Sequence, residues 1–338
     1  MRGIGIQPRG WTLYVLVITA LTLSGCSVLF PNPDDYKNQP DIVIETPAPT
    51  AASRPLIKPP PLPSVAIVLS SRQPAYQDVA TELTRRFENY EVYDLSDRSR
   101  PPVTVLRMIN DSDSTAVVAV GLRAAQSSVA MAGVPVVFSQ VFNHQDHDLL
   151  TTNSRGVAAL APLEAQLAAW KQADPTVVRV GIIIGDGHDD LIAEAQLAAE
   201  RHGMELRIQI AHSDQETLYI FRRMIRDIDG FWLFPDNRIL SSRVLQQMLD
   251  DANRLRVPVA VPNESMLKMG ATISMSTVAS DIAETIVQII RQIQAGNLER
   301  VPQISQLSEI RVETNDAMMK SGAVARSSTR RLGRDLTQ

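Results

Sequence analysis

The sequence predicts an α/β fold in which two lobes, each a doubly wound parallel sheet, are joined by a multi-strand hinge. From Ser64 onward, short runs dense in valine and isoleucine alternate with longer amphipathic segments. Such runs, without regular polar alternation, are typical of strands buried on both faces of a parallel sheet. A polar stretch at residues 145–155 interrupts the pattern, which then starts again and so indicates a second sheet. Residues 64–322 are long enough for two lobes of this kind.

The repetition of strand, helix and strand predicts right-handed βαβ units. Two helices are especially clear: isoleucines recur with a helical period in Asp281–Gly296, as do alanines and leucines in Leu191–Gly203. Each of these segments ends on a glycine, which is a common residue just after a helix. The predicted strands are Val65–Leu69, Thr115–Val120, Val134–Phe138, Val177–Ile184, Glu205–Ile210, Gly230–Phe234, Val257–Val261 and Ala271–Met275.

The chain is expected to cross between the lobes three times. The crossings are predicted within residues 145–155, near Pro262–Glu264 and near Val301–Gln306. The first lobe then comprises about 64–145 and 263–300, and the second about 155–262 and 301–322. Residues 323–338, rich in serine, threonine and arginine, are expected to form a disordered tail.

The N-terminus predicts export. Arg2 and Arg9 precede the apolar run Trp11–Leu23, which as a helix would be only ~20 Å long and too short to span a bilayer. A charged segment followed by a short apolar run is typical of a secretory signal peptide, here residues 1–25. Leu23-Ser24-Gly25-Cys26 resembles the bacterial lipobox, whose cysteine is acylated after cleavage. An ordinary signal peptide with a chance cysteine is the alternative.

Cys26 is the only cysteine of the chain, so no intramolecular disulfide can form and the thiol is available for lipid attachment. By resemblance to Gram-negative lipoproteins, Ser27 favours the outer membrane, facing the periplasm. Residues 26–63 are expected to be the lipid anchor and an extended linker, because they are rich in proline, including Pro59-Pro60-Pro61. A simple spacer is preferred over a proline-rich ligand for a partner.

Charge and motifs exclude several classes of function. Without the signal peptide the chain has 31 basic residues (33 less Arg2 and Arg9) against 37 acidic ones, which gives no electrostatic case for nucleic acid. No Walker A loop, Gly-x-Ser-x-Gly elbow or His-Glu-x-x-His motif occurs, so we expect no enzyme and no cofactor. Gly185-Asp186-Gly187 lacks the third glycine of a dinucleotide fingerprint. A metal site at His144, Asp146, His147 and Asp148 is disfavoured against a solvated loop.

Several segments together resemble the substrate-binding proteins of ABC transporters with the type I periplasmic binding protein fold. No single segment is specific; their order and spacing over residues 64–322 carry the resemblance. They are Val118-Ala-Val-Gly121 with Ala124-Ala125-Gln126, Val134-Pro-Val-Val-Phe-Ser139, Gly156-Val157 with Pro162-Leu163-Glu164-Ala165-Gln166-Leu167, Arg179-Val-Gly-Ile-Ile-Ile184, Trp232-Leu-Phe-Pro-Asp-Asn237, Val257-Pro-Val259 and Gly270-Ala271.

Ligands of open α/β sheets bind beyond the carboxyl ends of the strands, so the predicted ligand-binding residues lie there. Compared with the family pattern, Leu122 and Arg123 replace a small hydroxyl residue, and Asn263 with Glu264 replaces an aspartate. Asp236 is retained and would favour an amino group, although it fits equally well as the N-cap of a helix beginning near Ile239. The full predicted set is Ser71, Leu122, Arg123, Ser139, Gln140, Asp186, Asp236, Asn237, Asn263, Glu264 and Ser274.

The resemblance implies a lipid-anchored solute-binding protein that captures a small, amino-acid-like molecule between its lobes for an ABC importer. The implied partners are the small molecule, an ABC permease or another envelope protein, and the membrane through Cys26. The alternative is an envelope sensor or accessory lipoprotein that retains the fold without transport, which the altered pocket and Ser27 favour. A hydrolase on the same scaffold is supported by loop carboxylates alone.

Overall fold

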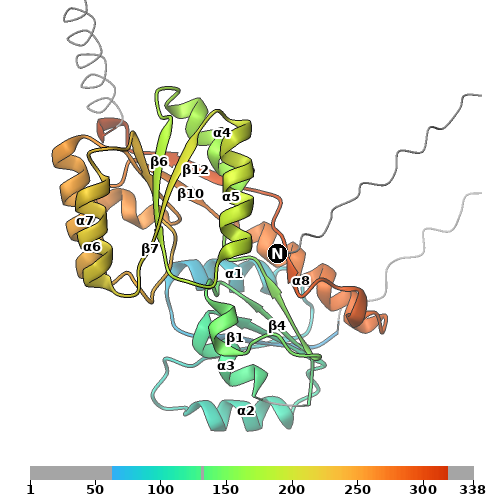
Figure 1. Ribbon diagram of the computed structural model, residues 1–338. Helices are drawn as coiled ribbons and strands as arrows, with labels where there is room; N and C mark the ends of the chain where they lie inside the picture. The colour runs from blue at the N-terminus through green and yellow to red at the C-terminus, as the bar shows by residue number, and fades with distance from the viewer. Residues whose placement is uncertain (1–62, 131–132, 319–338) are drawn as a thin grey trace, which may run out of the picture. The chain divides into compact units, whose positions relative to one another are not determined.

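The computed structural model describes residues 63–130 and 133–318 (Figure 1). The predicted signal peptide, Cys26, nearly all of the linker and the predicted tail lie outside the described residues. Among the helices that the structure describes, none is long and apolar enough to cross a bilayer.

The described chain contains two six-stranded sheets, which confirms the predicted two-lobe α/β fold. In the first lobe every neighbouring pair of strands is parallel. The strand order of this sheet is β11 (Ile304–Ser305), β5 (Ser154–Val157), β4 (Val136–Ser139), β3 (Ala116–Val120), β1 (Val65–Leu69), β2 (Tyr90–Asp94).

The second lobe repeats this arrangement, except that its edge strand β12 pairs antiparallel with β10. The other pairs of its sheet are parallel. The strand order is β12 (Arg311–Thr314), β10 (Ile273–Ser276), β9 (Val259–Val261), β8 (Gly230–Trp232), β6 (Arg179–Ile184), β7 (Glu205–Ile210).

Helices cover both faces of each sheet, which explains why all residues of β1 and β3 are buried. In the first lobe one face packs against α1 (Pro74–Thr84) and α8 (Ala279–Gln294). The other face packs against α2 (Pro102–Asn110) and α3 (Leu122–Val129). Because both faces of these central strands are covered by helices, their sequences are apolar throughout and show no polar alternation.

The second sheet also lies between two layers of helices, as Figure 1 shows for α4 and α5 on one side and α6 and α7 on the other. Trp170 of α4 is fully buried against this sheet, as is Phe221 of α6 on the opposite face. The four helices are α4 (Leu163–Ala173), α5 (Asp189–Arg201), α6 (Asp214–Met224) and α7 (Ser242–Leu255).

The predicted positions of the three crossings were wrong by one strand each. Strand β5 pairs with β4 of the first lobe, so the polar stretch 145–155 connects two strands of one sheet and the first crossing follows Val157. Strand β10 pairs with β9, so the second crossing follows Ser276 rather than lying at Pro262–Glu264. Strand β11 pairs with β5, so the third crossing lies at 306–310. A polar composition marks an exposed loop, whether or not the chain changes sheet there.

The lobe boundaries change accordingly. The first lobe contains β1 to β5, then α8 and β11, and the second contains α4 to β10 and then β12. The eight predicted strands all overlap observed strands of the two sheets. The sequence did not predict β2, β5, β11 or β12, which are short or polar and lie at or next to a sheet edge.

Candidate functional site

A network of polar side chains lies at the carboxyl ends of strands from both lobes. Its centre is Asp236, which follows β8 and has 1% of its surface exposed. The Asp236 carboxylate accepts hydrogen bonds from the backbone N–H of Gly185 at 2.9 Å and from Asn143 Nδ2 at 2.9 Å. The Arg238 side chain donates to the same carboxylate through Nε at 2.9 Å and Nη2 at 2.8 Å. These four bonds satisfy the buried charge from within the chain.

The network joins the two lobes because Asn143 belongs to the loop after β4, whereas Gly185 follows β6 in the second sheet. Asn143 Nδ2 also donates to Oδ1 of Asn237 at 3.0 Å. A further bond joins the end of β4 to the segment that follows β10: Gln140 Nε2 donates to Thr277 Oγ1 at 3.3 Å. Gln140 has a φ of 59°, a conformation that non-glycine residues adopt rarely and that is often found at functional sites.

Electrostatics keep the Asp236 carboxylate ionised. Burial by itself would raise the pKa of Asp236, but the hydrogen bonds from Arg238, Asn143 and Gly185 outweigh burial and lower the pKa to about 2. His188, also buried, lies beside this pair, with Nε2 2.8 Å from Arg238 Nη2. Burial and the neighbouring Arg238 charge lower the pKa of His188. A neutral His188 can accept a hydrogen bond from Arg238, which an imidazolium could not.

Asp146 provides the exposed end of the network. Its Oδ2 accepts a hydrogen bond from Arg238 Nη1 at 2.9 Å, and the two side chains are 37% and 30% exposed. Asp146 lies in the short helical turn η2 (His144–His147) of the first lobe. Because both groups are accessible to water, this ion pair is easier to exchange than the buried bonds of Asp236.

Gly185 is required by the close packing around the ion pair. A Cβ atom at this position would lie 2.6 Å from Arg238 Nη2 and 2.8 Å from Asp236 Oδ2. The glycine therefore allows the backbone N–H to reach the carboxylate at hydrogen-bond distance.

Only part of the predicted residue set is connected by these bonds. Asp236 and Asn237 belong to the network, and Gln140 lies near it in the chain. Asp186 is exposed and its Oδ1 lies 3.2 Å from Nδ1 of His212. Five other predicted residues follow strand ends and make no hydrogen bond to the network. They are Ser71, Leu122, Arg123, Asn263 and Glu264.

Two predicted ligand-binding residues have no exposed surface in this structure. Ser139, the last residue of β4, and Ser274, within β10, are fully buried, and neither hydroxyl has a hydrogen-bond partner in the described part of the chain. The alternative role of Asp236 as a helix N-cap is also wrong, because α7 begins at Ser242 and is capped by Ser241, whose side chain accepts from the Val244 N–H.

Sequence reasoning missed Asn143, His188 and Arg238, the partners of Asp236. A signal existed for Arg238 alone, which lies two residues after Asp236 just beyond a predicted strand. In the described residues, no group of three or more histidine, cysteine or acidic side chains is arranged to hold a metal ion.

A small, mainly apolar cavity of about 130 Å³ borders the network. His188 lines this cavity, together with Phe142 from the first lobe and Leu191 from the second. Two more residues of the lining are Leu160, which lies in the first crossing, and Glu194 of α5. An apolar cavity with a few polar groups at its edge is the usual form of a small-molecule site.

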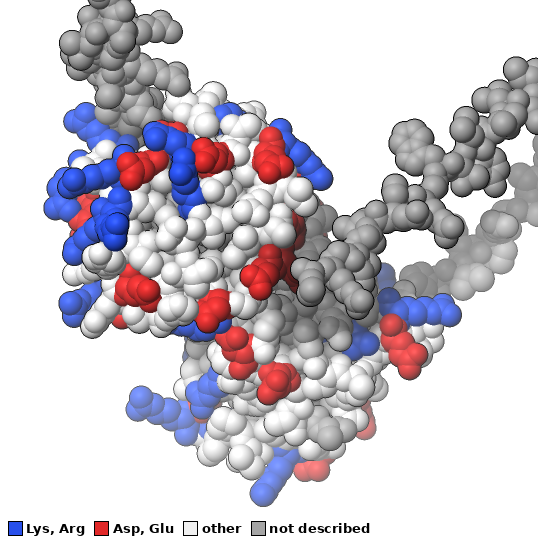
Figure 2. Space-filling model, in the orientation of Figure 1, with Lys and Arg blue, Asp and Glu red and all other residues white. Residues whose placement is uncertain are grey.

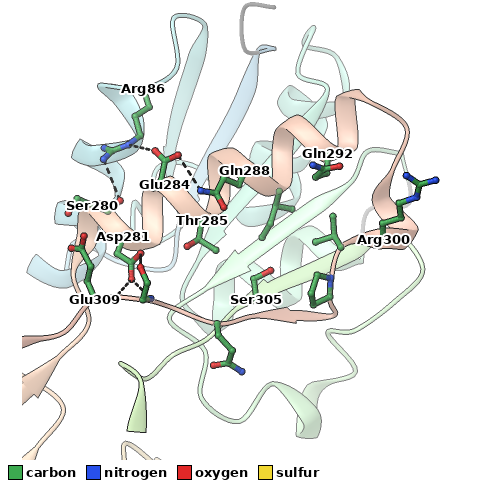
Figure 3. A pocket seen from close by; sticks show the side chains of 15 residues that line it. Arg86, Ser280, Asp281, Glu284, Thr285, Gln288, Gln292, Arg300, Ser305 and Glu309 are labelled. Carbon is green, nitrogen blue, oxygen red and sulfur yellow. Dashed lines mark hydrogen bonds and ion pairs between the residues drawn. The ribbon is translucent and has the colours of Figure 1, made fainter. Parts of the chain in front are cut away.

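Another cavity, of about 800 Å³, lies in the first lobe between α8 and residues 300–309 (Figure 3). None of the predicted ligand-binding residues lines it. On the face drawn in Figure 2, most of the described surface is neither acidic nor basic, and the basic side chains that gather at the upper left have acidic ones beside them. Such a face does not present the continuous positive surface expected for nucleic-acid binding.

Two α/β lobes linked three times, with a polar network and a small cavity at the ends of their strands, define a two-lobe binding protein. Residues 88–322 match the family model described as ABC transporter substrate binding protein. The chain belongs to this family, whose members bind solutes and are in general not enzymes. No similar sequence was found among curated proteins.

Solved structures share the type I periplasmic binding protein fold with this chain. A conserved domain protein from Vibrio cholerae superposes with a TM-score of 0.55 at 19% identity. A domain from Streptococcus pneumoniae in complex with L-Trp gives 0.56 at 16%, and a ligand-free, open substrate-binding protein with adhesive properties from Clostridium difficile gives 0.59 at 13%. Each comparison covers 78% of this chain and 95% of the other. At these identities the likeness is one of fold.

Proposed function

We propose that the protein is a lipid-anchored solute-binding protein of the cell envelope that holds a small molecule between its lobes and delivers it to an ABC permease. Membership of the substrate-binding family supports solute binding and a position outside the cytoplasm. The sequence Leu23-Ser24-Gly25-Cys26 supports lipid attachment at Cys26. In a host with two membranes, Ser27 favours the outer membrane, with the folded part facing the periplasm.

The observation that carries the proposal is the polar network beside the cavity of about 130 Å³, because both contain residues from the two lobes. A solute that contacts both lobes favours the state in which they are closed around it, by the difference in its affinity for the two states. A permease can then distinguish the loaded protein from the empty one.

The cavity supports a solute with a small apolar group. An engineered cavity of similar size, ~150 Å³, takes benzene in another protein, so about 130 Å³ admits a ring or a branched chain of that order. Asp236 is saturated by its own chain and offers no free oxygen to an amino group. The groups available for an amino-acid-like solute are Glu194, which lines the cavity without a partner among the described residues, and Arg238, if a solute carboxylate displaces Asp146.

The test is thermal unfolding of the full chain in detergent against a panel of small molecules. The panel contains aromatic, branched and basic amino acids, dicarboxylates, nucleosides and sugars. A ligand at a hundred times its dissociation constant adds ~2.7 kcal/mol, which raises the melting temperature by roughly 5 to 10 °C for a chain of this size.

Two variants locate the binding site. Leu160→Trp fills the cavity and should abolish the shift, whereas Leu197→Trp should not, because Leu197 is 57% exposed on α5 and lies outside the cavity lining. A shift that survives Leu160→Trp would place the solute elsewhere and would contradict the proposal.

The saturation of Asp236 favours a second candidate function, an envelope sensor or accessory lipoprotein without transport. In that case the network of Asp236, Asn143 and Arg238 holds the two lobes together without a solute. A panel that gives no shift, together with co-purification of an envelope protein that is not a permease, would favour this candidate.

A further inference from the structure

The ring of His188 is buried by residues of the other lobe. His188 follows β6 of the second lobe and is 5% exposed. Its ring centroid lies 4.8 Å from that of Phe142, and its Nε2 atom lies 3.1 Å from Asn143 Oδ1. Phe142 and Asn143 belong to the loop that follows β4 in the first lobe. Separation of the two lobes would therefore expose His188 to water.

The Nε2 atom of His188 lies between a donor and an acceptor. Arg238 Nη2, at 2.8 Å, can only donate a hydrogen bond, whereas Asn143 Oδ1 can only accept one. The Asn143 amide is oriented by its Nδ2 atom, which donates to Asp236 and to Asn237. Without a proton, Nε2 accepts from Arg238. With a proton, two donors of like charge face each other, and Arg238 must move.

Arg238 connects His188 to the first lobe. Its Nε and Nη2 atoms bond to the Asp236 carboxylate, and its Nη1 atom donates to Asp146 Oδ2 at 2.9 Å. The guanidinium group is planar and rigid, so a movement of Nη2 away from His188 also moves Nη1 away from Asp146. Because Asp146 belongs to the first lobe, a proton on His188 weakens an ion pair between the lobes.

The charges around His188 favour its neutral form in this arrangement of the lobes. The charged and titratable groups that face the ring are Arg238 and Asp236 after β8, Asp146 and His144 in η2, Asp186 after β6, and Glu194 of α5 in the lining of the same cavity. Burial lowers the pKa of His188, as does the Arg238 charge, and the three aspartates offset only part of this effect. Burial also lowers the pKa of His144, and a charge on His188 lowers it further.

We propose that His188 is a proton-operated latch: its neutral ring and Arg238 hold the lobes as they are in this structure, and its protonated ring lets them separate. Burial opposes the charged form of a group, so a proton favours the state in which the group is more exposed. The closed arrangement is thus favoured above the ordinary histidine pKa of ~6.5 and is lost as the pH falls below it. The effect on a solute rests on the proposed function, whereas the movement of the lobes does not.

The test measures an interlobe distance without solute, by double electron–electron resonance. In a Cys26→Ser chain, spin labels are attached at Asp113→Cys in the first lobe and at Arg243→Cys in the second, where both native side chains are exposed. Between pH ~7.5 and pH ~5, the range in which histidine titrates, the population at longer distances should rise at least ~5-fold, the lower end of typical coupling.

Two histidine variants assign the response. His188→Gln should abolish it, because the glutamine amide oxygen can accept from Arg238 and does not ionise. His202→Gln is the matched control: His202 lies at the other end of α5, where it contacts Glu164, and the change should leave the response intact.

A third variant tests the interlobe ion pair without altering the buried ring. Asp146→Asn removes the charge that Arg238 meets on the first lobe, so longer distances should be populated already at pH ~7.5. Asp148→Asn, two residues further on at an exposed position, should behave as wild type. An unchanged wild-type distribution at pH ~5, a shift to shorter distances, or a response that survives His188→Gln would overturn the proposal. Because no solute is present, these results do not depend on whether the thermal panel finds a ligand.

Discussion

The substitution Asp236→Asn tests whether the buried carboxylate is the energetic centre of the site. It keeps the size of the side chain but replaces a charged acceptor with a neutral amide. Hydrogen bonds to charged groups contribute ~1.5–3 kcal/mol each and neutral ones ~0.5–1.5 kcal/mol. The new NH₂ group must also face one of the donors on Gly185, Asn143 or Arg238, which leaves that donor without an acceptor.

The weaker hydrogen bonds from the two buried donors, Gly185 N–H and Asn143 Nδ2, each lower the free energy of unfolding by about 1 kcal/mol. The donor that faces the new NH₂ group and loses its acceptor lowers it by about 1 kcal/mol more. Arg238 adds little, because it is 30% exposed and keeps Asp146. The expected loss is therefore ~3 kcal/mol in the free energy of unfolding, measured with urea at pH 7. The control Asp113→Asn, at an exposed loop residue, should change stability by less than about 0.5 kcal/mol.

The same carboxylate predicts a pH dependence with a defined sign. Its pKa is about 2 in the folded protein against an ordinary value of 3.8. A lowered pKa means that the unfolded chain binds more protons in this range, so the stabilisation is full above pH ~4 and is lost as the pH falls towards 2. Asp236→Asn should flatten the stability curve in that window. If the variant is as stable as wild type at pH 7, or keeps the wild-type slope, the network is not as we describe it.

Three further substitutions test the packing around the site and the core. Gly185→Ala should lower the free energy of unfolding by ~1–3 kcal/mol, because its Cβ would lie 2.6 Å from Arg238 Nη2; an unchanged urea midpoint would contradict this. Gly121→Ala should lower the free energy of unfolding at least as much, because φ is +86° and the Cβ would lie 2.7 Å from Ser70 Oγ. Thermal melts followed by circular dichroism measure this change, and a gain in stability would refute it. Ile290→Ala, in the fully buried face of α8, should cost ~2–5 kcal/mol, and a loss below 1 kcal/mol would show that this face is not core.

Much of the fold could be predicted because the central strands are buried on both faces. Val65–Leu69 and the other apolar runs must lie between helices, whichever lobe they belong to. The edge strand Tyr90–Asp94 could not be recognised, because three of its five residues are exposed and its sequence mixes polar and aromatic residues. Ser154–Val157 offers only four residues beside a polar loop, and its omission displaced the predicted first crossing.

The site was predicted less well because its bonds connect segments far apart in the sequence. The position of Asp236 after a strand was visible, but the bond from Asn143 spans 93 residues and the one from Gly185 spans 51. Nor does the sequence show that Arg238 neutralises the carboxylate that a solute amino group was expected to meet. Burial of Ser139 and Ser274 is likewise a consequence of packing, which the pattern at a strand end does not reveal.

The central claim, that a solute binds between the lobes, is tested most directly by measuring an interlobe distance. Cys26 is the only cysteine, so after Cys26→Ser two spin labels can be attached at Asp113→Cys in the first lobe and Arg243→Cys in the second. Double electron–electron resonance then gives their distance with and without the solute that produces the largest thermal shift. We predict a shorter and narrower distance distribution with the solute, and no such change in the Leu160→Trp variant. A solute that binds tightly and leaves the distribution unchanged would contradict the account.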